Sequence, residues 1–84
     1  MSKTQQFKLN ISLSDRLANY LVTQPNILNK YSGCSYVVFS YKNEELNKLN
    51  NQLIPGLKLE GKPVVKAQET NDLNNPWVLT PIFN

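Results

Sequence analysis

The strongest structural signal in the chain is the stretch Ser35-Tyr36-Val37-Val38-Phe39-Ser40-Tyr41. Aromatic and β-branched residues dominate it, and such residues favour a strand. Because apolar side chains occupy successive positions, both faces of this strand should be covered by other parts of the protein. We therefore predict a strand over residues 35–41 in the centre of a sheet.

The segments before this strand predict a second strand and two helices. Within residues 7–13, apolar positions alternate with polar ones: Phe7, Leu9, Ile11 and Leu13 are apolar. Strict alternation predicts a half-buried strand. Ser14 is a suitable N-cap for a helix that should end before Pro25. A short helix over residues 26–31 is expected next, closed by Gly33.

After the central strand the pattern first predicts one more helix. Asn43 is a favourable N-cap, and the helix should bury leucines at helical spacing: Leu46, Leu49 and Leu53. Pro55 with Gly56 should end this helix.

The last third of the chain is predicted to be β-structure. Residues 57–59 and 63–68 would form a hairpin around a turn at residues 60–62, although the length of the turn leaves the register open. Residues 77–83 form a final strand, and Pro81 places that strand at a sheet edge.

These elements predict a small α+β domain that comprises residues 1–84. The sheet should be mostly antiparallel, with about four to five strands, and two or three short helices should cover one face. Residues 1–5 are polar and are expected to be flexible. A chain of 84 residues is the size of one domain, and a domain of this size buries roughly 60 to 65% of its unfolded surface.

The composition excludes several kinds of chemistry. The chain has no histidine, so it cannot build a Ser-His-Asp triad, a Cys-His pair or a histidine metal site. Its one cysteine, Cys34, rules out an internal disulfide and a cysteine zinc site. We therefore expect neither catalytic residues nor a cofactor or metal. With no signal peptide and no long apolar run, we expect a cytoplasmic protein with no membrane contact.

The net charge of +3 favours a weak attraction to acidic partners. On the predicted hairpin, Lys58, Lys62 and Lys66 share one side and the tip. They form a candidate nucleic-acid contact, and Tyr36 could add base stacking. Lysines on an edge hairpin also prevent aggregation, and this second interpretation is the commoner one.

The final strand supplies candidate contacts for a protein partner: Trp77, Leu79 and Phe83. An edge strand with large apolar groups can receive another strand, including one from a second copy in a homodimer. Alternatively, these side chains close the core.

The leading hypothesis is a small non-enzymatic protein that acts through protein contacts as an inhibitor, adaptor or regulator, of the kind that phages and other mobile elements encode. The alternative is a protein that binds single-stranded DNA or RNA through the lysine hairpin and nearby aromatic residues.

Overall fold

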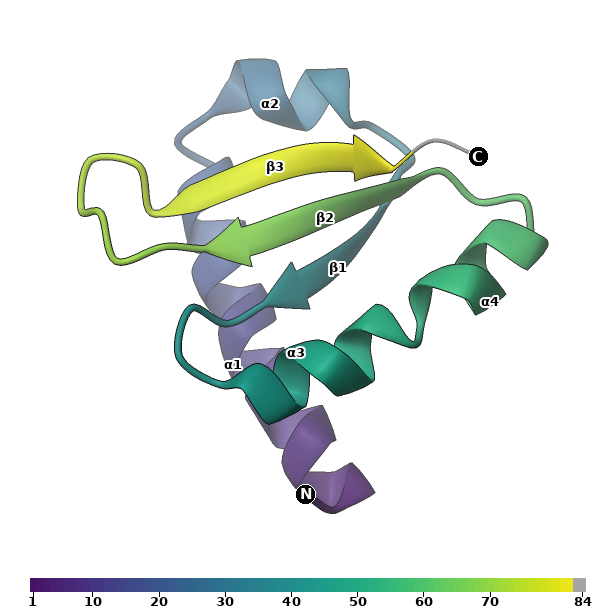
Figure 1. The fold of residues 1–84 in the computed structure, drawn as a ribbon. Coiled ribbons are helices and arrows are strands. Elements are labelled where there is room, and N and C mark those ends of the chain that lie inside the picture. The colour runs from purple at the N-terminus through teal and green to yellow at the C-terminus, as the bar shows by residue number, and fades with distance from the viewer. Residues whose placement is uncertain (83–84) are drawn as a thin grey trace.

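Three strands form one mixed sheet in the computed structural model, which describes residues 1–82 (Figure 1). β1 (Ser35–Phe39) pairs in parallel with β2 (Val64–Glu69), and β2 pairs antiparallel with β3 (Trp77–Ile82). The predicted α+β class is therefore confirmed, while the larger, mostly antiparallel sheet is not. The strand predicted around β1 exists, but it lies at an edge, and β2 is central. Pro81 lies in the other edge strand, as predicted.

A helix of 19 residues, α1 (Lys3–Leu21), replaces the strand predicted near the N-terminus. The hydroxyl of Ser2 accepts a hydrogen bond from the Gln5 backbone at 3.1 Å, and the Gln5 side chain accepts one from the Ser2 backbone at 2.9 Å. This reciprocal capping box fixes the start of the helix. Residues 1–5, which we expected to be flexible, therefore contain the cap and the first turn.

The alternating pattern of residues 7–13 has a different meaning in a helix. Residues four apart lie on the same side of a helix, so Leu9 and Leu13 share one side, and Phe7 and Ile11 share another. Between Lys3 and Gln24 there is no glycine or proline to separate a strand from a helix. The predicted strand was therefore wrong because two helical lines of apolar residues imitate alternation.

The predicted short helix is confirmed as α2 (Pro25–Lys30), with the proline in its first turn. That place suits proline because the first backbone N–H groups of a helix have no partner within it. Gly33 has a φ of +81°, which glycine adopts without a steric penalty, and the chain enters β1 two residues later.

Two helices, α3 (Glu44–Asn51) and α4 (Ile54–Leu59), connect β1 to β2. The predicted cap is present, because the Asn43 side chain accepts a hydrogen bond from the Leu46 backbone at 3.0 Å. Gln52 and Leu53 lie between the two helices. Pro55 lies in the first turn of α4, so it does not end helical structure. The strand predicted over residues 57–59 and its hairpin were therefore wrong, and a helical crossover makes β1 and β2 parallel.

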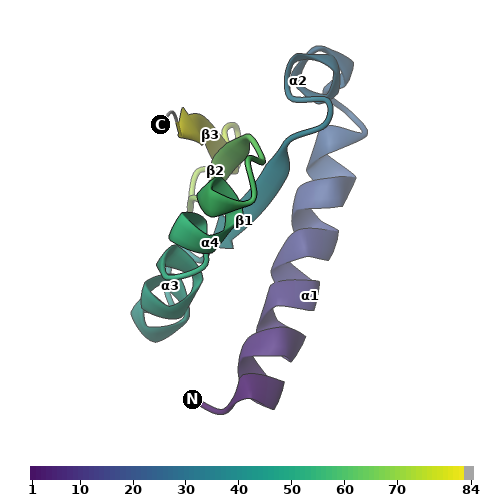
Figure 2. The same ribbon diagram turned by 90° about the vertical axis from the view of Figure 1, so that its right-hand side faces the viewer.

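Helices lie on both faces of the sheet, which corrects the prediction that they cover one face. Figure 2 shows α1 along one side of the sheet and α4 on the other. α3 lies against the edge of β1, where Leu46 packs into the core on the α1 side. The core on the α1 side consists of Leu13, Leu17, Leu21, Val38, Leu46, Ala67 and Trp77. The core on the α4 side consists of Val37, Phe39, Ile54 and Val64. Successive residues of β1 therefore enter different cores, as strand geometry requires.

Candidate functional site

The two edges of the sheet differ in how their backbone groups are satisfied. In the parallel ladder, the Ser35 N–H donates to the Pro63 carbonyl at 2.8 Å. The backbone groups of alternate residues, Tyr36, Val38 and Ser40, therefore point away from β2. This outward row on β1 is one of the two places where another strand could be added to the sheet.

Amide side chains of α3 close much of the β1 edge. Asn47 accepts a hydrogen bond from the Ser40 N–H and donates one to the Ser40 carbonyl, both at 2.6 Å. Asn50 donates to the Val38 carbonyl at 2.8 Å. These amides take the place that a neighbouring strand would occupy, so α3 blocks strand addition along this half of β1.

Asn50 is also the hub of a buried amide cluster between α1 and α3. Its side chain donates to Asn10 at 2.7 Å, and it accepts hydrogen bonds from Asn10 at 3.0 Å and from Gln6 at 3.2 Å. Only 1% of Asn50 is exposed. The leucine pattern of α3 predicted a buried side chain at Leu53, which is 48% exposed, and did not indicate Asn50. Asn50 lies four residues after Leu46 and therefore on the same side of α3, and this spacing was the available signal for its burial.

The β3 edge has no such cover. The Thr70 N–H donates to the Pro76 carbonyl at 2.8 Å, which sets the alternation of the antiparallel ladder. The backbone groups of Trp77, Leu79 and Pro81 therefore point away from β2. We call this outward row the β3 edge. Within residues 1–82, no hydrogen bond joins these outward groups to another element.

The β3 edge has a helix beside it on one side of the sheet. α2 lies on the same side as α1, and in Figure 1 it lies beyond β3, away from β2. Ile27 of α2 and Leu79 pack against the same core, and Leu28 of α2 is 40% exposed. A strand added to β3 would therefore meet apolar surface of α2 on that side. Proline at position 81 leaves two outward N–H donors, those of Trp77 and Leu79.

The predicted lysine hairpin does not exist. Lys58 lies in α4, Lys62 lies in the turn that follows it, and Lys66 lies in the central strand. The Lys62 ammonium pairs with Glu60 at 3.2 Å. The Lys66 ammonium lies 4.7 Å from the centre of the Phe39 ring, a cation–π contact on the α4 side of the sheet. The three lysines therefore do not form the phosphate-binding ribbon that the hairpin implied.

The other predicted contact residues are placed as follows. Tyr36 is half-buried against the core on the α1 side, so it is not an open stacking surface. Burial, reinforced by Cys34 and Tyr31, raises the pKa of Tyr36 above 10.0. Trp77 is 6% exposed and belongs to the same core. Its side chain closes the core, which was the alternative interpretation, whereas its backbone belongs to the β3 edge. Leu79 is half-buried.

The remaining residue of that prediction, Phe83, lies outside the described residues. Cys34 is a half-buried free thiol.

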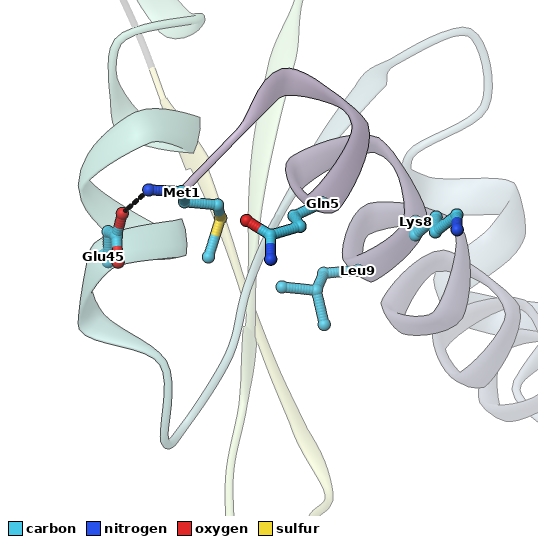
Figure 3. Close-up of a pocket in the computed structure, with 5 residues that line it drawn as sticks. All are labelled: Met1, Gln5, Lys8, Leu9 and Glu45. Carbon is cyan, nitrogen blue, oxygen red and sulfur yellow. Dashed lines mark hydrogen bonds and ion pairs between the residues drawn. The ribbon is translucent and has the colours of Figure 1, made fainter.

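A hollow of about 470 Å³ lies between the first turns of α1 and the start of α3 (Figure 3). It is lined by Met1, Gln5, Lys8, Leu9 and Glu45. The ammonium group of Met1 pairs with the Glu45 carboxylate, while Lys8 points away from that pair. The lining thus contains one carboxylate, which an ammonium group already engages, and no cysteine or hydroxyl side chain.

The described residues show neither a metal-binding cluster nor a membrane-spanning helix, and the chain matches no known protein. Residues 1–82 contain no group of three or more acidic or cysteine side chains that could hold a metal ion. In the same part of the chain, no helix has the length and apolar character needed to cross a membrane. Comparison with protein-family models, with curated proteins and with solved structures finds no protein that matches this chain.

Proposed function

We propose that this protein is a small non-enzymatic binding module that captures an extended segment of a protein partner by strand addition at the β3 edge. The observation that carries the proposal is the contrast between the edges: α3 amides close half of the β1 edge, and the β3 edge has no cover among the described residues. Strand addition obtains affinity from main-chain hydrogen bonds and specificity from alternate side chains.

The chemistry of the β3 edge defines the partner segment. It supplies the N–H groups of Trp77 and Leu79 and the carbonyl groups of both, together with the carbonyl of Pro81. The side chains that alternate with them, Val78 and Thr80, are exposed on the α4 side of the sheet. The segment should therefore be extended and free of proline where it meets Leu79, with apolar side chains toward α2. Such binding would suit an inhibitor, adaptor or regulator.

The first experiment identifies the partner and the surface together. A photo-crosslinking amino acid at position 80 should capture the partner in the source cell, and the same amino acid at Ser12 on α1 serves as the control. When the purified partner is added, hydrogen exchange at the Trp77 and Leu79 amides should slow. Unchanged exchange at both amides would contradict strand addition, even if the partner binds elsewhere.

A second experiment removes one donor. Chemical ligation can replace the amide before Leu79 with an ester, which deletes the outward N–H and retains the side chain. One hydrogen bond contributes about 0.5 to 1.5 kcal/mol, so the partner should bind roughly 2- to 13-fold more weakly. Leu73→Ser in the loop before β3, where the leucine is 96% exposed, should leave affinity unchanged.

A further inference from the structure

The outer side of α1 has a line of apolar residues that nothing in the described chain covers. Phe7, Ile11 and Val22 are 66%, 47% and 71% exposed, and Ala18 is exposed as well. Their spacings of four, seven and four residues place them along one side of a helix. Figure 2 shows no other element over the side of α1 that faces away from the sheet. We call these four residues the outer stripe.

The outer stripe is separate from the core-facing side of the same helix. Leu13, Leu17 and Leu21 are 2%, 4% and 6% exposed and pack against the sheet. A helix at the surface of a domain normally has one apolar side and is polar elsewhere. Phe7, Ile11 and Ala18, together with Ser14 between them, have the alternating spacing of four and three residues that a helix-to-helix seam requires. α1 therefore has one apolar side for its own domain and a second without an internal partner.

From this arrangement we infer that the outer stripe binds α1 of a second copy in antiparallel orientation, forming a twofold homodimer. In this orientation large residues of one copy face small residues of the other. When Phe7 faces Ala18 of the second copy, Ile11 faces Ser14 of that copy. A twofold axis makes each contact occur twice. This inference is independent of strand addition, because it uses none of the residues of the β3 edge.

Charge complementarity supports the second copy as the occupant. Lys8 and Asp15 are seven residues apart, so they flank the outer stripe on the same side. Neither forms an ion pair with a described residue. In the antiparallel alignment Lys8 lies within about 3 Å, along the axis, of Asp15 in the second copy. A parallel twofold pair would put the two copies of Lys8 and Asp15 on opposite flanks of the seam, so this ion pair forms only in the antiparallel arrangement.

The size of the contact sets the expected strength. A helix of 19 residues is about 28 Å long, and two such helices alone bury less than the roughly 1,200 to 2,000 Å² of a stable interface. The dimer should therefore be weak and reversible. Sedimentation velocity of the full chain from about 5 to 500 μM should show a shift from monomer to dimer.

Charge reversal tests the antiparallel arrangement. Lys8→Asp or Asp15→Lys alone should raise the dimer dissociation constant by about three- to tenfold, as expected for surface ion pairs that become repulsive. The double variant should restore it, because each reversed charge then faces its opposite. Ile11→Ser should weaken the dimer by more than tenfold. Leu73→Ser, at a leucine of the loop before β3 that is 96% exposed, is the control and should have no effect.

Three results would overturn the inference. The first is a monomer throughout the concentration range. The second is a dimer that Ile11→Ser does not weaken, which would place the interface elsewhere. The third is a monomer that binds vesicles containing anionic lipid and loses that binding with Ile11→Ser, which would assign the outer stripe to a membrane surface.

Discussion

Asn50 should be the most sensitive polar position in the protein. Asn50→Ala removes the donor to the Val38 carbonyl and the centre of the contact with Gln6 and Asn10. Gln6 and Asn10 are only half-buried, so water can replace part of what they lose. Val38 is 6% exposed and its carbonyl faces α3, so its lost hydrogen bond is the hardest to replace.

The magnitude follows from these differences. Leaving one buried carbonyl unsatisfied costs about 1 to 3 kcal/mol. The space left by the amide group adds to this cost, and the higher helix propensity of alanine offsets up to about 0.7 kcal/mol. The expected loss in the free energy of unfolding is about 2 to 3 kcal/mol. For a domain of this size each kcal/mol lowers Tm by roughly 4 to 8 °C, so Tm should fall by about 8 to 24 °C.

Urea unfolding followed by circular dichroism measures this loss, with Asn51→Ala as the control. Asn51 is exposed at the end of the same helix, so its substitution should change stability by less than about 0.5 kcal/mol. Asn50→Leu retains volume but not the donor, so it should also destabilise the protein. A leucine variant as stable as the native protein would refute the argument, because packing alone would then explain the position.

The other predictions concern backbone geometry, ionisation and the core. Gly61→Ala should destabilise the protein by about 1 to 2 kcal/mol because Gly61 has a φ of +75°. Gly56→Ala in α4 should stabilise it by about 0.5 to 1 kcal/mol, because alanine has the higher helix propensity. Thermal unfolding of both variants measures this contrast. Absorbance titration against Tyr36→Phe should show that the phenol of Tyr36 ionises above pH 10.0. Because its pKa is raised in the folded state, its contribution to stability is complete below the unfolded pKa and is lost as pH rises through the folded pKa. Leu17→Ala should lower the free energy of unfolding by about 2 to 5 kcal/mol, because Leu17 is buried. Val22→Ala, at an exposed residue, should lower it by less than about 0.5 kcal/mol in the monomer. Equal losses in the two variants would contradict the orientation of the helix.

Local signals predicted the elements that depend on neighbouring residues. Asn43 caps α3, and Pro25 begins α2. Both outcomes follow from hydrogen bonds or dihedral angles within one helical turn. The capping box at Ser2 and Gln5 is equally local, and it was the missed signal for α1.

The errors occurred where one pattern fits two structures. Alternation over residues 7–13 matches a strand, yet it also describes a helix with apolar residues on two sides. In the same way, Pro55 can end one helix or open the next, and here it lies in the first turn of α4. A proline in the first turn loses no helical hydrogen bond, so its presence alone cannot distinguish these cases.

The candidate site was predictable only in part. Pro81 indicated an edge strand because proline has no N–H to donate, and a sheet tolerates this where the position faces away from the neighbouring strand. Nothing local indicated that α3 would close the other edge, since Asn47 and Asn50 reach Ser40 and Val38 only after the helix has packed against β1. The predicted lysine cluster was wrong because it required a hairpin between residues 57–59 and 63–68, and the first of these segments lies in α4.

By itself the sequence determined which chemistry is absent and where two local features lie, the Asn43 cap of α3 and the proline that opens α2. The lack of histidine, the single cysteine and Pro81 are properties of composition and of single residues, and they hold in any fold. Only the tertiary structure decided that β2 is central, that Asn50 is buried and that the β3 edge is open. These features depend on which distant segments pair with each other. Pairing is selected by the burial and hydrogen bonding of complete sheet faces and edges. Each segment contributes only part of such a face, so its own residues do not determine the pairing.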